Sequence, residues 1–206
     1  MTPSIDFRLF LITDRARCAP RALDEVVREA CAAGVRAVEL RERDADVREL
    51  ARLSAIAHAH GARLFVNART LTAVGAAAAT GVDGVHFPDH PHALNCAGST
   101  LTVGRSVHSV AAARAAAATG VDYLLFSPVF APISKATYAA PSGLGALAEV
   151  ARAVDIPVFA LGGITPDNAR ACIEAGATGV ALIGAIMGAA DVAAEVRRFE
   201  EALGGL

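Results

Sequence analysis

Residues 157–186 read PVFALGGITPDNARACIEAGATGVALIGAI and hold one complete strand, helix and strand unit. The apolar run 157–163 has the length of a buried strand, and the Thr-Pro pair after it is a typical helix start. The helix then ends near Gly176, where a glycine can take the left-handed conformation that closes a helix. A second apolar run follows at 179–184. This order is typical of parallel strands joined by a helix.

The same unit recurs along the chain in both directions from this stretch. The predicted strands are 8–14, 37–43, 63–69, 84–88, 101–106, 123–130, 157–163 and 179–184. The predicted helices are 21–33, 46–60, 70–80, 109–119, 143–153, 166–175 and 190–203. The fourth connection, DHPHALNCAGST, is too short and too interrupted by proline for a good helix. Several helices end in the same glycine signature, as at 33–35, 80–82 and 119–121.

Eight such units predict an α/β protein whose strands form a closed parallel (β/α)8, or TIM, barrel. We expect residues 1–206 to make one domain of this kind, near the lower size limit of the fold. A doubly wound open sheet is the alternative. That fold usually carries a glycine-rich phosphate loop after its first strand, whereas here the first strand runs into ITDRARCAP.

Composition excludes several classes of protein. Hydrophobic residues make up 54% of the chain and no long uncharged apolar run occurs, so we expect no membrane span. The formal net charge is −2 and no cluster of Lys and Arg occurs, which argues against a nucleic-acid partner. The four cysteines lie far apart, which predicts reduced thiols without a zinc site. The N-terminus does not resemble a signal peptide, so we expect a cytoplasmic protein.

A barrel of this kind places its active site at the carboxyl ends of the strands. The glycines of LGGIT follow the seventh strand and IGAI follows the eighth, and backbone amides of these two loops commonly bind phosphate. The candidate phosphate-binding residues are therefore Gly162, Gly163, Ile183 and Gly184. The alternative is that the two glycines only make a tight turn before the next helix.

His108 follows the fifth strand in GRSVHS and should face the barrel mouth. Histidine is the side chain best suited to move protons near neutral pH, so His108 is the candidate acid and base. A helix-capping or structural role is the alternative. The other histidines lack convincing metal-ligand spacing.

Further polar residues at the strand ends are candidates for substrate binding. Arg41, in the Arg-Glu-Arg that ends the second strand, can hold an anion, although a salt-bridge network at the strand end is the alternative. Ser134 and Lys135 lie in a long segment, VFAPISKATYAAPSGLG, which is typical of a lid but can also be an insertion with an ordinary solvated lysine. The candidate substrate-binding residues are Arg41, Asn67, Ser106, Ser127, Ser134 and Lys135.

The ordered set RER, VNAR, GVHF, GRSVHS, DYLLFSPVF with SK, ALGGI and GVALIGAI resembles the superfamily of thiamine-phosphate synthases and TenI proteins. The resemblance runs from Leu9 to about Phe199. Synthases of that superfamily carry Asn-Asp-Arg after the third strand and a second aspartate after the fourth, and these carboxylates hold Mg²⁺. This chain has Ala68 at the first position and Pro91 at the second, with Asp89 two positions early.

The TenI branch resembles this chain in having a small residue at that aspartate and in the string at 104–109. This resemblance implies a thiazole tautomerase, an isomerase that converts a non-aromatic thiazole carboxylate phosphate into its aromatic tautomer. It implies that His108 moves the proton, that the glycine loops hold the phosphate, and that Arg41 and Asn67 face the carboxylate. It implies no cofactor and no metal.

Two other functions stay open at this point. One is a thiamine-phosphate synthase, which couples a pyrimidine pyrophosphate with a thiazole phosphate and would need Mg²⁺. The other is a homologue that binds a phosphorylated ligand without catalysis, because a barrel fold alone does not establish a reaction. Phosphate-binding barrels of tryptophan or histidine biosynthesis are more distant alternatives. The resemblance also implies a homodimer or homotetramer.

Overall fold

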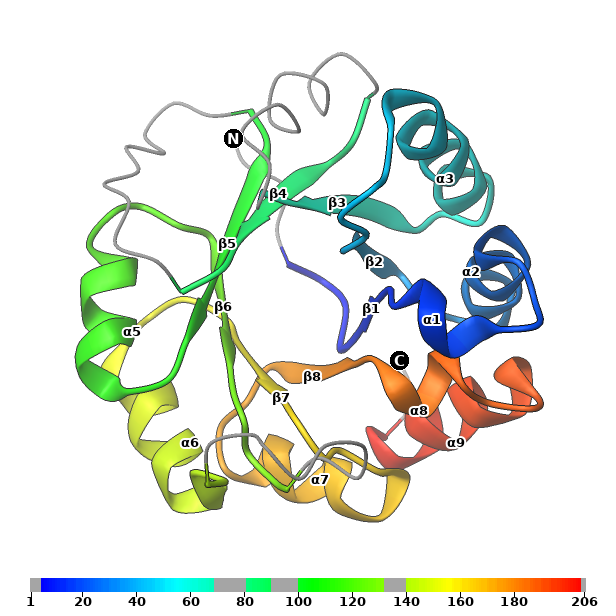
Figure 1. Ribbon diagram of the computed structural model, residues 1–206. Helices are drawn as coiled ribbons and strands as arrows, with labels where there is room; N and C mark the ends of the chain where they lie inside the picture. The colour runs from blue at the N-terminus through cyan, green and yellow to red at the C-terminus, as the bar shows by residue number, and fades with distance from the viewer. Residues whose placement is uncertain (1–4, 69–80, 90–99, 132–139, 205–206) are drawn as a thin grey trace.

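The computed structural model describes residues 5–68, 81–89, 100–131 and 140–204. Within them, eight parallel strands close into one barrel in the order of the chain, and helices surround it (Figure 1). The strands are β1 (Leu9–Ile12), β2 (Ala37–Leu40), β3 (Arg63–Asn67), β4 (Gly84–Phe87), β5 (Thr102–Val107), β6 (Tyr123–Phe126), β7 (Val158–Leu161) and β8 (Gly179–Leu182).

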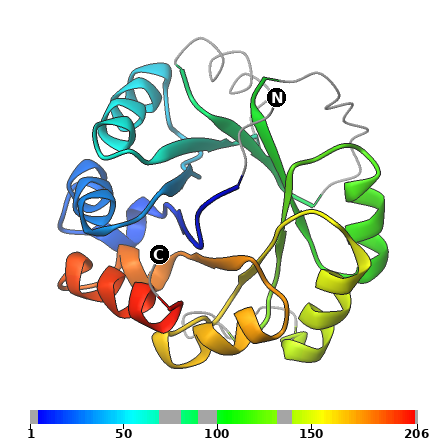
Figure 2. The same ribbon diagram turned by 180° about the vertical axis from the view of Figure 1, so that it is seen from behind.

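Closure is decided by the pairing of the first strand with the last. Phe10 of β1 lies opposite Ala37 of β2 on one side and opposite Ala181 of β8 on the other. No edge is therefore left between β1 and β8, and the predicted TIM barrel is confirmed against the open sheet. Figure 2, from behind, shows the same ring of strands with helices outside it.

The helices follow the predicted positions closely and add two short ones. The described helices are α1 (Arg15–Cys18), α2 (Leu23–Ala33), α3 (Val47–Ala59), α5 (Val110–Ala117), α6 (Gly143–Ala153), α7 (Pro166–Glu174), α8 (Gly184–Met187) and α9 (Val192–Ala202). The one-turn helices α1 and α8 were not predicted, because four residues are too few to show a helical period. The helix predicted at 70–80 and most of the fourth connection lie outside the described residues. None of the described helices is long and apolar enough to cross a membrane.

Two hydrophobic layers stabilise the barrel. One lies between strands and helices and consists mainly of aliphatic side chains. The other fills the interior with the rings of Phe7, Phe10, Phe65, Tyr123 and Phe159, whose centroids lie 5.0–6.1 Å apart. Offset and edge-to-face rings at such distances attract one another beyond the area they bury. These rings form a packed aromatic floor beneath the carboxyl ends of the strands.

Gly104 of β5 makes room for the largest of these side chains. A Cβ at Gly104 would lie 2.0 Å from Cζ of Tyr123, well inside the contact distance of two carbon atoms. Tyr123 is completely buried there. The small residue on β5 and the large one on β6 thus form one packing unit.

We expect Gly104→Ala to destabilise the protein by about 2–3 kcal/mol or more, since the added methyl displaces the Tyr123 ring. Gly145→Ala is the matched control, because Gly145 lies inside α6 and a Cβ there meets nothing within 4 Å. Removing that helical glycine should stabilise the protein by up to about 1 kcal/mol. Urea unfolding followed by circular dichroism measures both. Equal effects of the two substitutions would contradict the packing argument.

Candidate active site at the barrel mouth

A polar layer lies directly above the aromatic floor, at the carboxyl ends of the strands. Side chains alternate along each strand, so the residues two positions after an interior ring also point inward. Phe65 is followed in this way by Asn67 and Tyr123 by Leu125, and Ser127 comes directly after the end of β6. The structure thereby brings Asn67, Ser106 and Ser127 to the same end of the barrel as predicted.

Glu39 of β2 and Asn67 of β3 form a hydrogen-bonded pair in this layer. Nδ2 of Asn67 donates to Oε1 of Glu39 over 2.7 Å. A carboxylate only accepts, so the amide nitrogen must face Glu39 and the Oδ1 of Asn67 faces the other way. Glu39 is 1% exposed, and its Oε2 has no hydrogen-bond partner among the described residues. The β2 end therefore presents one buried hydrogen-bond acceptor, Oε2 of Glu39.

His86 of β4 lies beneath the mouth and links two neighbouring strands. Its Nε2 is 2.8 Å from Oγ of Ser106, and its Nδ1 is 3.2 Å from the hydroxyl of Tyr123. Burial lowers the pKa of His86, and the nearby Glu39 carboxylate opposes this effect to a smaller extent. Burial likewise raises the pKa of Tyr123 well above its ordinary value. His86 is thus a neutral side chain that connects Tyr123 with Ser106. Ser106, which was predicted to bind substrate, contacts His86 in the structure.

His108 occupies the position that its sequence context predicts, exposed at the end of β5. Its Nδ1 donates to the backbone carbonyl of Ser127 over 2.5 Å. Because a carbonyl cannot donate, the proton of the neutral ring is on Nδ1, and Nε2 is left as the acceptor. Nε2 lies 3.8 Å from a carboxylate oxygen of Asp89. The ring is therefore oriented to take or give a proton through Nε2.

Two arginines share one carboxylate above β1. Oδ2 of Asp14 is 3.1 Å from Nε of Arg17 and 3.9 Å from Nη2 of Arg41. Arg17 also reaches the start of α8, directly after β8, since its Nη1 is 3.2 Å from where a Cβ of Gly184 would be. The mouth thus carries positive side chains between the ends of β8 and β2. Arg41 lies at this mouth as predicted, and Asp14 is a further polar residue expected at a strand end, whereas Arg17 was not predicted to take part.

The glycine pair after β7 is required by a close approach of the backbone. Gly162 and Gly163 have φ of +100° and +64°, and a Cβ on Gly163 would lie 2.5 Å from the carbonyl oxygen of Ala131. Gly163 therefore packs against the segment that follows β6. This observation fits both the phosphate-binding prediction and the alternative of a tight turn. Ile183 and Gly184 begin α8 directly after β8, next to this turn.

Some predicted residues take other places. Ser134 and Lys135 lie outside the described residues, so their predicted role as a lid stays a prediction. Glu42 forms an ion-pair network with Arg15, as the alternative interpretation of Arg-Glu-Arg had it. Ser127 contributes its backbone carbonyl, through the contact with His108.

The family resemblance implies Mg²⁺ for a synthase, and the described residues do not fit such an ion. No group of three or more His, Cys, Asp or Glu in the described part of the chain can hold a metal. Ala68 lies in the hydrophobic layer between barrel and helices, and a methyl group offers no oxygen ligand. We therefore derive no step through a metal ion.

Comparison with known proteins decides the family. A model of the family described as thiamine monophosphate synthase matches residues 9–186. The chain belongs to this family. A thiamine-phosphate synthase of Syntrophomonas wolfei is 35% identical and covers 95% of this chain and 96% of its own length. One from Moorella thermoacetica is 40% identical over 86% of each chain. The structure of a thiamine phosphate pyrophosphorylase from Pyrococcus furiosus is similar with a TM-score of 0.82, 34% identity and 95% coverage of both chains.

These findings confirm the predicted superfamily and favour its synthase branch over its TenI branch. The relatives carry the name of the synthase, a transferase, and they give the tautomerase interpretation no specific support. The residues missed from the sequence are Arg15 and Arg17, whereas Asp14 and His86 are polar strand-end residues that were given no role, and Glu39 was left without one. Strand parity was the signal that could have found Glu39, because it lies two positions after Ala37, which points inward.

We expect the stability of the protein to decrease as the pH falls, and we expect His86 to contribute to this decrease. The unfolded chain binds a proton on this imidazole near a pKa of about 6.5, whereas burial lowers the pKa in the folded state. The corresponding stability is complete above that pH and is lost as pH falls toward the folded pKa. The free energy of unfolding, measured with urea between pH 7.5 and 5, should depend less on pH in His86→Asn than in the wild type. The control His60→Asn should show the same pH dependence as the wild type. Ordinary titration of the His86 ring by NMR would contradict this.

Proposed function

We propose that this protein is a thiamine-phosphate synthase, which joins a pyrimidine pyrophosphate to a thiazole phosphate and releases pyrophosphate. The observation that carries the proposal is the similarity over nearly the whole chain to relatives named for this reaction. The proposal thus replaces the tautomerase as the preferred function and keeps the same barrel mouth as the site.

The hydrogen-bonded pair of Glu39 and Asn67 at the ends of β2 and β3 supports this choice on chemical grounds. Oε2 of Glu39, which has no hydrogen-bond partner among the described residues, favours a ligand that donates hydrogen bonds, such as the amino group of an aminopyrimidine. A substrate carboxylate next to the buried Glu39 would meet like charge. The pair therefore suits the pyrimidine of the synthase better than the carboxylate of the tautomerase substrate.

The other residues of the mouth take matching roles in the proposed reaction. The nitrogen of the thiazole attacks the methylene carbon of the pyrimidine substrate, and the carbon–oxygen bond to pyrophosphate breaks. Arg41 binds the pyrophosphate, and a protonated His108 donates from Nε2 to the departing oxygen. Gly162, Gly163, Ile183 and Gly184 hold the phosphate of the thiazole through backbone amides. Ser106 acts through its contact with His86, Ser127 orients His108, and Ser134 and Lys135 close over the substrates.

The first test is thiamine phosphate formation from the two substrates in a buffer containing Mg²⁺. Wild-type protein should form the product, and His108→Ala should lower kcat by on the order of a hundredfold through loss of the proton donor. His58→Ala, on α3, is the matched control and should keep wild-type kcat. Product formation at the uncatalysed rate by the wild type would reject the synthase.

A second test addresses Glu39. Glu39→Met keeps the length of the side chain and removes both oxygens. We expect it to raise the KM for the pyrimidine pyrophosphate about tenfold through lost hydrogen bonds, with the KM for thiazole phosphate changed less than about twofold. Steady-state kinetics with each substrate varied in turn measures both values. A rise confined to thiazole phosphate would place the pyrimidine elsewhere.

The thiazole tautomerase remains a second candidate because of two specific features. Ala68 replaces the first metal-binding aspartate of the synthases, and His108 presents an accepting Nε2 that can remove and return a proton. The same preparations should be assayed by absorbance for aromatisation of the thiazole carboxylate phosphate. Turnover there that depends on His108, together with no thiamine phosphate, would establish the tautomerase in place of the synthase.

A further inference from the structure

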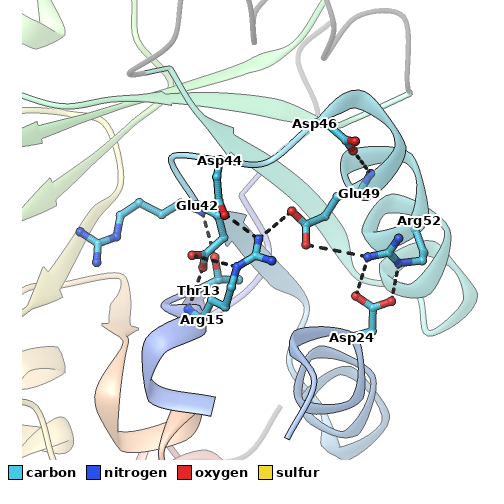
Figure 3. Close-up of polar contacts among 9 residues, drawn as sticks. Thr13, Arg15, Asp24, Glu42, Asp44, Asp46, Glu49 and Arg52 are labelled. Atoms are coloured by element: carbon cyan, nitrogen blue, oxygen red, sulfur yellow. Dashed lines mark hydrogen bonds and ion pairs between the residues drawn. The ribbon is translucent and has the colours of Figure 1, made fainter. Parts of the chain in front are cut away.

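Arg15 lies among three carboxylates at the start of α1 (Figure 3). Its Nη2 is 2.8 Å from Oε2 of Glu49 and 3.6 Å from Oδ1 of Asp44, and its Nε is 3.8 Å from Oε2 of Glu42. We call these four residues the Arg15 network. Glu42 and Asp44 belong to the loop between β2 and α3, and Glu49 to the first turn of α3. One guanidinium therefore joins α1 to the loop that begins with Arg41.

Backbone hydrogen bonds tie the same two segments together on both sides of this ion pair. The amide of Arg15 donates to Oε1 of Glu42 over 3.0 Å, and the amide of Arg41 donates to Oγ1 of Thr13 over 2.9 Å. Thr13 is fully buried, and its own amide donates to the carbonyl of Glu39. The segment after β1 therefore donates hydrogen bonds to the β2 end and also accepts one from it. Arg41 is thus fixed by its backbone at a point next to Glu42.

The carboxylates of the Arg15 network need this cation. The side chains of Glu42 and Glu49 are only 10% and 11% exposed, so water screens their charges poorly. A hydrogen bond to Glu49 is the main reason that the pKa of Arg15 is raised. Without the guanidinium, Glu42, Asp44 and Glu49 would repel one another, and the loop after β2 would move away from α3.

We propose that Arg15 is a positioning residue for the substrate site: through Glu42 it holds the loop after β2 so that Arg41 meets the pyrophosphate of the substrate. This inference rests on the proposed function in one respect, namely that Arg41 binds the pyrophosphate. Arg15 itself contacts no substrate, because its guanidinium is directed at the three carboxylates (Figure 3).

Arg52 offers a matched control within the same group of charges. Its guanidinium lies 3.8 Å from Oε1 of Glu49 and pairs closely with Asp24 of α2. It therefore joins α3 to α2, one step away from the loop that carries Arg41. A loss of charge at Arg52 perturbs Glu49 without removing the contact to Glu42.

The test measures binding and turnover separately. Calorimetry with inorganic pyrophosphate reports the anion site, and steady-state kinetics reports the reaction. We expect Arg15→Gln to weaken pyrophosphate binding and to raise the KM for the pyrimidine pyrophosphate about tenfold, with kcat within about threefold of wild type. Arg15→Lys should recover part of the loss because it keeps the charge, and Arg52→Gln should stay within about twofold of wild type.

A double-mutant cycle links the effect to Arg41. Because Arg15 acts through Arg41, adding Arg15→Gln to Arg41→Gln should cause no further loss of pyrophosphate binding. Glu42→Gln is a second variant, for use if Arg15→Gln does not fold, because it removes the negative charge from the same contact. Additive losses in the cycle, or an equal loss in Arg52→Gln, would overturn the positioning role.

Failure of the proposed reaction is distinguishable from failure of this inference. A wild-type protein that binds pyrophosphate but forms no thiamine phosphate rejects the synthase, and the binding cycle then still decides the role of Arg15. A wild-type protein that does not bind pyrophosphate overturns the positioning role, since Arg41 then has no such anion to hold.

Discussion

Tyr123 fills the space that Gly104 leaves open, and this contact sets the level at which the barrel interior changes from apolar to polar. Below it lie the phenylalanine rings, which exclude water from the floor. Above it lie Glu39, Asn67, His86 and Ser106, joined in hydrogen-bonded pairs. The Tyr123 hydroxyl itself contacts His86 and so connects the two levels. Every proposed role at the mouth depends on this floor, because it determines how deeply a substrate can enter.

Most of the fold was predictable because the information is local. The strands and long helices show in short apolar runs, in the Thr-Pro helix start and in glycines such as Gly34 and Gly176, whose positive φ is confirmed. Most strand ends were predicted one to four residues too long, as at 37–43 against Ala37–Leu40, since apolar pattern alone does not show where pairing stops. The fifth strand instead ends one residue later than predicted. The one-turn helices α1 and α8 are fixed by tertiary contacts with neighbouring segments and leave no period in the sequence.

The site was predictable in its positions and less so in its partners. His108, Arg41 and the glycine turn follow from the rule that strand ends carry the chemistry. The pairing of Glu39 with Asn67 joins residues 28 positions apart, and that of Arg15 with Glu49 joins residues 34 apart. Such pairs depend on strand register and on the path of a loop, which no local pattern contains. The direction in which Asn67 presents its oxygen therefore became visible only in the structure.

The position of Tyr123 also has an optical consequence. The chain contains no tryptophan and two tyrosines, so its near-ultraviolet emission comes from tyrosine. Tyr123 lies at the centre of the barrel with its hydroxyl on His86 and its ring stacked beside that imidazole. A ligand that disturbs His86 or Ser106 alters the surroundings of this fluorophore directly. The protein thus carries an intrinsic reporter of the depth to which a molecule enters its mouth.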